Sequence, residues 1–428
     1  MPNPGDRVKV ITVDEELEGI LMPEDKECMY LKLSSGYNIG VVKSKVKKIT
    51  VLASAKKQQK ETPTAKQKQG LPTITILHTG GTIASKVDYS TGAVIAKFSP
   101  EDILQLFPEL QKIARIHSHL VSNLQSESLR FGHYNLMAKA IAEEIKQRKP
   151  KGIIITHGTD TMHYTAAALA FMLENISIPI ILVGAQRSSD RPSSDAGMNL
   201  LCAATFIAET DFRGIAICMH ENPDDNACLI LPPCQSRKLH TSRRDAFKAV
   251  NDLPVAKVDY GKEKIDWLNK NYYKGKGEFR ATFMKEKIKV GIFRSHTNTM
   301  PEDFLHYKNF DGLILEGTGL GHLQTMGFDA ISQINEENKK ALGQIIKNGC
   351  ITVLTSQCIF GRVNMNVYTP QRQLLEIGVI PGEDMTTETA FIKLAWLLSN
   401  YPKEKVKELM QKNLRGEITE RTDIREQV

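Results

Sequence analysis

The sequence predicts an α/β protein in which two α/β units with mainly parallel sheets follow a small all-β barrel of the SH3 or Sm kind. After residue 72, near-continuous apolar runs alternate with amphipathic stretches, which is typical of a parallel sheet covered by helices on both faces. Before residue 53, short β-branched runs are separated by acidic or glycine-containing turns. We therefore expect a β module at 1–52, a lysine-rich linker at 53–71, an α/β unit at 72–256, an irregular connection at 257–287 and a second α/β unit at 288–428.

The expected elements follow these patterns in chain order. Apolar alternation predicts strands of the β module at 6–13, 19–22, 29–33 and 40–52. In the first α/β unit, buried runs predict strands at 73–78, 152–156, 178–183 and 214–219, and helical periodicity predicts helices at 100–107, 132–148, 161–174 and 195–209. The second unit should have strands at 289–293, 312–315 and 351–355, with helices at 301–307, 332–348 and 387–398.

The net charge of +7 comes from one stretch of the 428 residues. Lys43 to Lys68 holds nine lysines and one acidic residue, so the rest of the chain is close to neutral. The apolar and charged fractions, 41% and 25%, exclude a disordered chain. No apolar run is long enough to span a membrane and no secretory signal is read. The seven cysteines form no C-x-x-C pair, which favours reduced thiols in a cytoplasmic protein without a metal site.

Two polar loops follow predicted parallel strands, where open α/β sheets bind ligands. The first, H-T-G-G-T-I at 78–83, places Thr82 after two glycines that permit a tight turn. A phosphate loop is a weak alternative because the sequence lacks G-K-[ST], and Thr82 could also simply cap a helix.

The second loop, H-G-T-D-T at 157–161, sets a hydroxyl beside a carboxylate at Thr159 and Asp160. A threonine hydroxyl needs a base before it can act as a nucleophile, and a neutral lysine could be that base. Capping of the following helix is the alternative role for this pair.

Together with V-G-A-Q-R-S-S-D-R-P at 183–192, the two loops resemble the bacterial-type L-asparaginase superfamily over about residues 72–415. The resemblance implies that Thr82 attacks a carboxamide carbon, that the acyl-enzyme is hydrolysed by water, and that the loop at 84–98 closes over the substrate. It further implies a site at a dimer interface and, residue by residue, catalytic roles for Thr82, Tyr89, Thr159, Asp160 and Lys248. Substrate contacts would come from Ser126, Glu127, Gly81 and Gly158, the two glycines through backbone amides that stabilise the oxyanion.

The β module and the linker add a second resemblance, to the D subunits of archaeal-type glutamyl-tRNA(Gln) amidotransferases. That family implies release of ammonia from glutamine or asparagine by a homodimer, which joins an E subunit in a heterotetramer. The E subunit would bind glutamyl-tRNA(Gln) and use ATP and Mg²⁺, whereas this chain would need no cofactor. The lysines at 43–68 could attract tRNA phosphates or could simply keep the linker solvated.

Two other functions remain open from the sequence. One is a free-standing L-asparaginase with an accessory β domain. The other is a non-catalytic binding protein of the ribonucleoprotein type, in which the β module and the lysine-rich stretch are the functional parts and the α/β units serve as a scaffold. The set of Thr82, Thr159, Asp160 and Lys248 argues against it. Release of ammonia from glutamine or asparagine distinguishes the enzymes from the binding protein.

Overall fold

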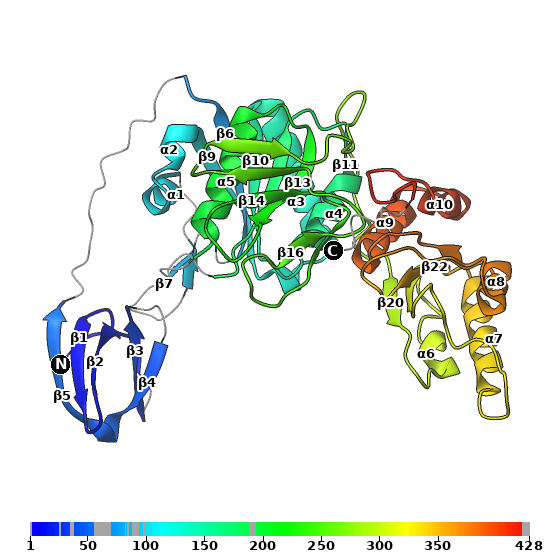
Figure 1. The fold of residues 1–428 in the computed structure, drawn as a ribbon, viewed down its shortest axis with the longest axis horizontal. Helices are drawn as coiled ribbons and strands as arrows, with labels where there is room; N and C mark the ends of the chain where they lie inside the picture. Colours follow the sequence, from blue (N-terminus) through cyan, green and yellow to red (C-terminus); the bar gives the residue numbers. More distant parts are fainter. Residues whose placement is uncertain are drawn as a thin grey trace.

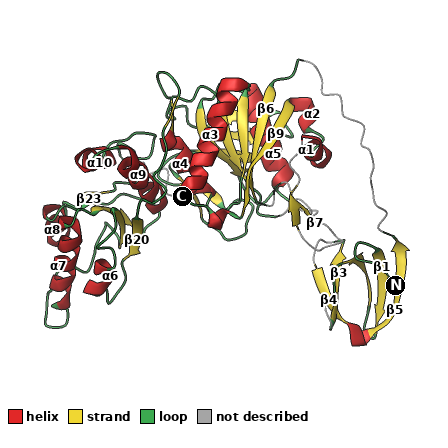
Figure 2. Ribbon diagram, turned by 180° about the vertical axis from the view of Figure 1, so that it is seen from behind, coloured by secondary structure: helices red, strands yellow, loops and turns green. Residues whose placement is uncertain are grey.

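The fold is that of a computed structural model. It describes residues 2–24, 27–34, 38–54, 70–81, 83, 85–87, 94–96, 100–187 and 194–421. Figures 1 and 2 show a small all-β module, a large α/β unit and a smaller C-terminal α/β unit, in chain order.

The N-terminal β module is a five-stranded antiparallel sheet with the order β4-β3-β2-β1-β5. Its core holds Val8, Val10, Leu31 and Val41 among other apolar side chains. The continuous strand expected at 40–52 is instead broken, because β4 pairs with β3 whereas β5 pairs with β1 across the sheet, and the short 3₁₀ helix Lys43–Lys45 connects them. The strands are β1 Arg7–Thr12, β2 Glu16–Leu21, β3 Cys28–Leu33, β4 Asn38–Val42 and β5 Val46–Ala53.

The large unit is built on an eight-stranded sheet with the order β18-β17-β14-β13-β12-β10-β6-β9. Strands β13, β12, β10, β6 and β9 are parallel, whereas β14, β17 and β18 extend the sheet with antiparallel pairs. Their bounds are β6 Thr73–Gly80, β9 Arg115–Leu124, β10 Gly152–Thr156, β12 Pro179–Val183, β13 Gly214–His220, β14 Cys228–Leu231, β17 Ala256–Asp259 and β18 Lys264–Trp267.

Helices cover both faces of this sheet (Figure 2), as the sequence predicts. Alternate residues of one strand serve opposite cores: Ile153 and Ile155 pack toward α3 and α4, whereas Ile154 packs toward α5. The helices are α1 Pro100–Leu106, α2 Leu110–Ile113, α3 Phe131–Gln147, α4 Met162–Met172 and α5 Ala196–Glu209.

The structure corrects the expectation for residues 257–287. Strand β17 extends into the start of this segment and β18 follows it, so residues up to Trp267 include two strands of the large sheet rather than only an irregular connection. Three short ribbons complete the unit. They are β7 Ser85–Val87 with β8 Val94–Ala96, β11 Leu173–Glu174 with β19 Arg280–Ala281, and β15 Ser236–Lys238 with β16 Phe247–Ala249.

The C-terminal unit is a parallel four-stranded sheet with the order β20-β21-β22-β23. Helix α9 joins the two α/β units, since the Trp396 ring stacks on Phe171 of α4 with 5.6 Å between ring centroids. The bounds are β20 Val290–Arg294, α6 Pro301–Leu305, β21 Gly312–Gly317, α7 Ile334–Lys347, β22 Ile351–Ser356, α8 Thr369–Glu376, β23 Ile380–Pro381, α9 Thr387–Asn400 and α10 Lys403–Met410.

Two expectations from composition concern membrane spans and thiols. No helix in the described part of the chain is both long and apolar enough to cross a membrane. The seven cysteines are all described and all carry free thiols, and only Cys358 is exposed.

Candidate active site

The two motif loops meet backbone to backbone at the carboxyl edge of the large sheet. Gly80 ends β6 and Gly81 follows it, with φ angles of +117° and +79°, which side-chain-bearing residues rarely adopt. A Cβ atom on Gly81 would lie 2.8 Å from the amide nitrogen of Gly158 in the loop after β10. A Cβ atom on Gly80 would lie 2.0 Å from the carbonyl oxygen of Leu124, at the end of β9. Glycine is therefore required for the close approach of these loops.

The predicted nucleophile Thr82 and its predicted partner Tyr89 lie outside the described residues. Their nearest described neighbours in the chain include Gly81 and Ile83, and the Ile83 side chain is buried in the core under α5. The Gly81–Gly158 contact thus fixes the backbone position from which residue 82 continues.

A lysine joins the threonine and the carboxylate of the second loop. The Lys238 Nζ donates to Thr159 Oγ1 at 2.9 Å and to Asp160 Oδ1 at 2.7 Å. The Thr159 side chain is buried and the Lys238 side chain is only 11% exposed, whereas that of Asp160 is 65% exposed. A proton can pass along the Lys238–Thr159 hydrogen bond, and the open carboxylate of Asp160 can accept a ligand's ammonium group.

The lysine predicted from the sequence, Lys248, is not the one that contacts Thr159 and Asp160. Lys248 lies elsewhere, with its Nζ donating to the Glu221 carbonyl at 2.9 Å and 3.3 Å from the Asp245 carboxylate. In the β15–β16 ribbon, Lys248 is directly opposite Arg237, the neighbour of Lys238 in the chain. Because neighbouring residues of a strand point to opposite faces, Lys238 and Lys248 lie on opposite faces of the ribbon.

Ser126 belongs to the same group of residues. It begins a short 3₁₀ helix, Ser126–Ser128, directly after β9, and its side chain is buried. A Cβ atom on Gly158 would lie 2.8 Å from Ser126 Oγ, and Thr161 Oγ1 donates to the Ser126 carbonyl at 2.7 Å. The neighbouring Glu127 is exposed. The loop after β9 is therefore tied to the H-G-T-D-T loop, with a carboxylate available to solvent beside it.

Two histidines, His157 in the second loop and His163 in α4, are buried beside the site. The Nδ1 and Nε2 atoms of His157 lie 2.6 Å from the Gly158 carbonyl oxygen and 2.8 Å from Thr165 Oγ1. Burial lowers the pKa of His157 to about 4, so its ring is neutral near pH 7. The pKa of His163 is lowered to about 3, first by burial and then by the positive charges of Arg237 and Lys238.

The third motif, V-G-A-Q-R, forms the neighbouring wall. The backbone N–H groups of Gln186 and Arg187 donate to the two carboxylate oxygens of Asp195 at 3.0 and 2.9 Å. The Nδ2 atom of Asn199 in α5 donates to the Gly184 carbonyl at 3.0 Å. Gly184 in turn leaves room for Thr159, because a Cβ atom there would lie 2.7 Å from Thr159 Cγ2. The loop after β12 thereby positions the threonine of the loop after β10.

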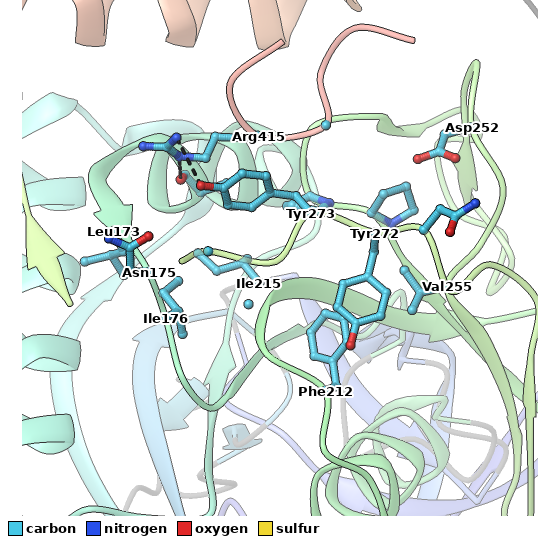
Figure 3. A pocket seen from close by; sticks show the side chains of 17 residues that line it. Leu173, Asn175, Ile176, Phe212, Ile215, Asp252, Val255, Tyr272, Tyr273 and Arg415 are labelled. Atoms are coloured by element: carbon cyan, nitrogen blue, oxygen red, sulfur yellow. Dashed lines mark hydrogen bonds between the residues drawn. The ribbon is translucent and has the colours of Figure 1, made fainter. Parts of the chain in front are cut away.

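A separate pocket lies at the opposite end of the large sheet (Figure 3), around the start of β13. Phe212, Ile215 and Tyr272 line it, and Arg415 donates to the hydroxyl of Tyr273 at 3.5 Å. None of its lining residues comes from the three motifs. The pocket is therefore distinct from the candidate active site.

Two residues of the candidate site, Lys238 and Thr161, are not predicted from the sequence. Lys238 ends a short strand, Ser236–Lys238, whose polar sequence gives no buried-strand signal. Thr161 belongs to the H-G-T-D-T motif, which the sequence does identify. Its contact with Ser126, however, follows only from the fold.

Comparisons with known proteins show which family the chain resembles. The sequence models described as "Asparaginase, N-terminal", "Glutaminase/Asparaginase C-terminal domain" and "GatD N-terminal domain" match residues 73–272, 289–410 and 2–52. Two L-asparaginase structures, from Thermococcus kodakarensis and Vibrio cholerae, superpose with TM-scores of 0.71 and 0.68 at 30% identity. They cover 81% and 82% of this chain, and 99% of their own chains.

Full-length relatives extend the likeness to the β module. The D subunit of glutamyl-tRNA(Gln) amidotransferase from Archaeoglobus fulgidus is 41% identical over 416 residues, 97% of this chain and 95% of that protein. The protein of the same name from Pyrococcus furiosus is 43% identical over 429 residues, 97% of this chain and 94% of that protein. With this likeness running through the β module and both α/β units, the chain belongs to the family of glutamyl-tRNA(Gln) amidotransferase D subunits.

Proposed function

We propose that this chain is the amidohydrolase subunit of a tRNA-dependent amidotransferase. It releases ammonia from glutamine or asparagine, and the ammonia converts glutamyl-tRNA(Gln) to glutaminyl-tRNA(Gln). The observation that supports this most strongly is the likeness to D subunits over 97% of the chain, including the β module. The solved asparaginases leave about a fifth of the chain uncovered.

The proposed mechanism is acyl transfer through Thr82. Its Oγ1 attacks the carboxamide carbon, with Tyr89 as its hydrogen-bonding partner, and the backbone amides of Gly81 and Gly158 stabilise the oxyanion. The carbon–nitrogen bond then breaks, the leaving nitrogen takes a proton, and ammonia departs. Water hydrolyses the resulting ester, which returns the Thr82 hydroxyl and yields glutamate or aspartate.

The cluster of Thr159, Asp160 and Lys238 supplies proton transfer in this scheme. The hydrogen bond from Lys238 to the buried Thr159 hydroxyl supports this role, which the sequence alone assigned to Lys248. The exposed carboxylates of Asp160 and Glu127 suit the substrate's α-ammonium group, and Ser126 suits its α-carboxylate.

The proposed assembly is a homodimer that binds an E subunit to form a heterotetramer. The chain itself needs no cofactor for amide hydrolysis, whereas the partner would bind ATP, Mg²⁺ and most of the glutamyl-tRNA(Gln). We further propose that this complex works in the cytoplasm.

A free-standing L-asparaginase is the second candidate, because the solved L-asparaginases align along 99% of their own length. The deciding experiment measures ammonia release from glutamine and from asparagine by the purified chain, with and without an E-type partner and glutamyl-tRNA(Gln). Release that rises strongly with partner and charged tRNA supports the amidotransferase. Full asparagine hydrolysis by the chain alone, unchanged by both additions, supports the free-standing enzyme. No ammonia under any condition excludes both.

A further inference from the structure

Two histidines and a buried glutamate form a compact cluster on the face of the large sheet that α3 covers. His117 and His119 stand two residues apart on β9, the edge strand, and therefore point to the same face. Glu144 reaches toward them from α3. One ligand atom from each residue lies within 4.8 Å of the others.

The sheet and the helix both hold Glu144 in place. Thr75 of β6 is directly opposite His117 in the strand register, and its hydroxyl donates to Glu144 Oε2 at 2.9 Å. The Glu144 side chain is only 7% exposed, whereas that of His119 is 38% exposed. The carboxylate is thus fixed at the base of the cluster, and an ion can reach it from the open edge of the sheet.

One cation already competes for this carboxylate. Arg148, one turn along α3, donates from Nε to Glu144 Oε1 at 3.1 Å, while His119 Nδ1 lies 3.7 Å from the same oxygen. The Arg148 side chain is 50% exposed, so it can swing into solvent and leave Oε1 free. A purely structural role, in which Arg148 simply neutralises Glu144, is the alternative to metal binding.

We propose that His117, His119 and Glu144 bind a divalent transition-metal ion of the zinc class and thereby link β9 to α3. Imidazole nitrogens with one carboxylate are preferred zinc ligands, and water would fill the fourth position. Bonds of ~2.0–2.1 Å in a tetrahedron place ligand atoms roughly 3.3 Å apart. The ligand atoms lie up to 4.8 Å apart in the structure, so side-chain rotation must shorten the longest of these distances by about 1.5 Å when the ion binds.

The test titrates the metal-free full-length protein with Zn²⁺ by calorimetry and with Co²⁺ by visible absorption. We expect one equivalent to bind, with cobalt bands of nitrogen and oxygen ligation and a Tm that rises with Zn²⁺. His119→Ala and His117→Ala should weaken binding by more than the ~10–100-fold typical of losing an outer-shell partner. The matched control His306→Ala removes an exposed histidine at the end of α6 and should bind as the wild type does.

Arg148→Ala provides a second, opposite test. Because it removes the competing guanidinium, binding should be unchanged or tighter. The proposal is overturned if no equivalent binds, if His119→Ala binds as tightly as the wild type, or if Arg148→Ala binds more weakly. Sulfur-to-cobalt charge-transfer bands would also overturn it, because they would assign the ion to the cysteines. If an alanine variant fails to fold, His117→Asn and His119→Asn replace it in the same comparison.

Discussion

Replacing Lys238 by methionine should remove most of the amide hydrolysis while leaving the fold intact. The Lys238 ammonium bridges Thr159 and Asp160 at 2.9 and 2.7 Å, and methionine fills similar space without a proton to transfer. General acid–base groups contribute roughly 10²–10⁴ in rate, which corresponds to about 2.7–5.4 kcal/mol of barrier. The stability cost should be modest, about 1–3 kcal/mol, because the Asp160 carboxylate of the lost ion pair is 65% exposed but the buried Thr159 hydroxyl loses its donor.

The assay is ammonia release from glutamine, measured as kcat and kcat/KM, with a thermal melt to check the fold. Lys248→Met is the matched control, since this lysine lies on the other face of the ribbon and should change the rate only a few-fold. Lys238→Arg keeps the positive charge but cannot give up a proton, so it should also be poorly active. The assignment is refuted if Lys238→Met hydrolyses glutamine at the wild-type rate, or if Lys248→Met shows the larger loss. High activity in Lys238→Arg would refute a proton-transfer role.

Three further predictions concern the loops, a buried ion pair in the C-terminal unit and pH. Gly81→Ala places a Cβ 2.8 Å from the Gly158 nitrogen at a φ of +79°, so it should lower the free energy of unfolding in urea by about 1–3 kcal/mol and lower kcat/KM. The control is Gly343→Ala in α7, where a Cβ meets nothing within 4 Å, and it should slightly stabilise the protein. Equal changes in stability for the two variants would contradict the packing argument. Lys393→Met leaves the fully buried Glu417 without its 2.6 Å partner and should destabilise the chain by about 3–5 kcal/mol in the same assay, so a loss below about 1 kcal/mol would count against a tightly paired site. The pKa of His163 is lowered in the folded state to about 3, so below the unfolded value of ~6.5 the unfolded chain binds the extra proton and the free energy of unfolding decreases as the pH is lowered. His163 alone should cost about 2 kcal/mol of stability between pH 7 and pH 5. The variant His163→Gln should reduce the slope of unfolding free energy against pH, and an unchanged slope would refute neutral burial.

The sequence predicts the buried parallel strands well because burial on both faces leaves a clear apolar signal. Strand β10 has the same bounds as its expected range, and β6 differs only by two added residues of the T-G-G-T-I loop. Strand β9 has no counterpart among the predicted strands. It is an edge strand in which polar residues, such as His117, Ser118 and His119, interrupt any continuous apolar run.

The candidate site could be predicted only where it follows strand ends. Thr159, Asp160 and Ser126 stand on loops whose position comes from the order of the parallel sheet, and the structure brings them together around Gly158. The lysine that contacts Thr159 is set by which residues of the three-residue strand β15 face the site. The spacing of residues in the sequence does not reveal that face. Lys248, which the sequence predicts, and Lys238 occupy opposite faces of the β15–β16 ribbon.

The most direct test of the proposed function follows the amide nitrogen itself. The chain, an E-type partner, ATP, Mg²⁺, glutamyl-tRNA(Gln) and glutamine labelled with ¹⁵N at the amide are combined, and the amino acid released from the tRNA is examined by mass spectrometry. We predict ¹⁵N in the amide of tRNA-bound glutamine with the wild-type chain and little or none with Lys238→Met. Transfer of the label at the wild-type rate by the Lys238→Met chain, or no transfer by the wild-type complex, would contradict the proposal.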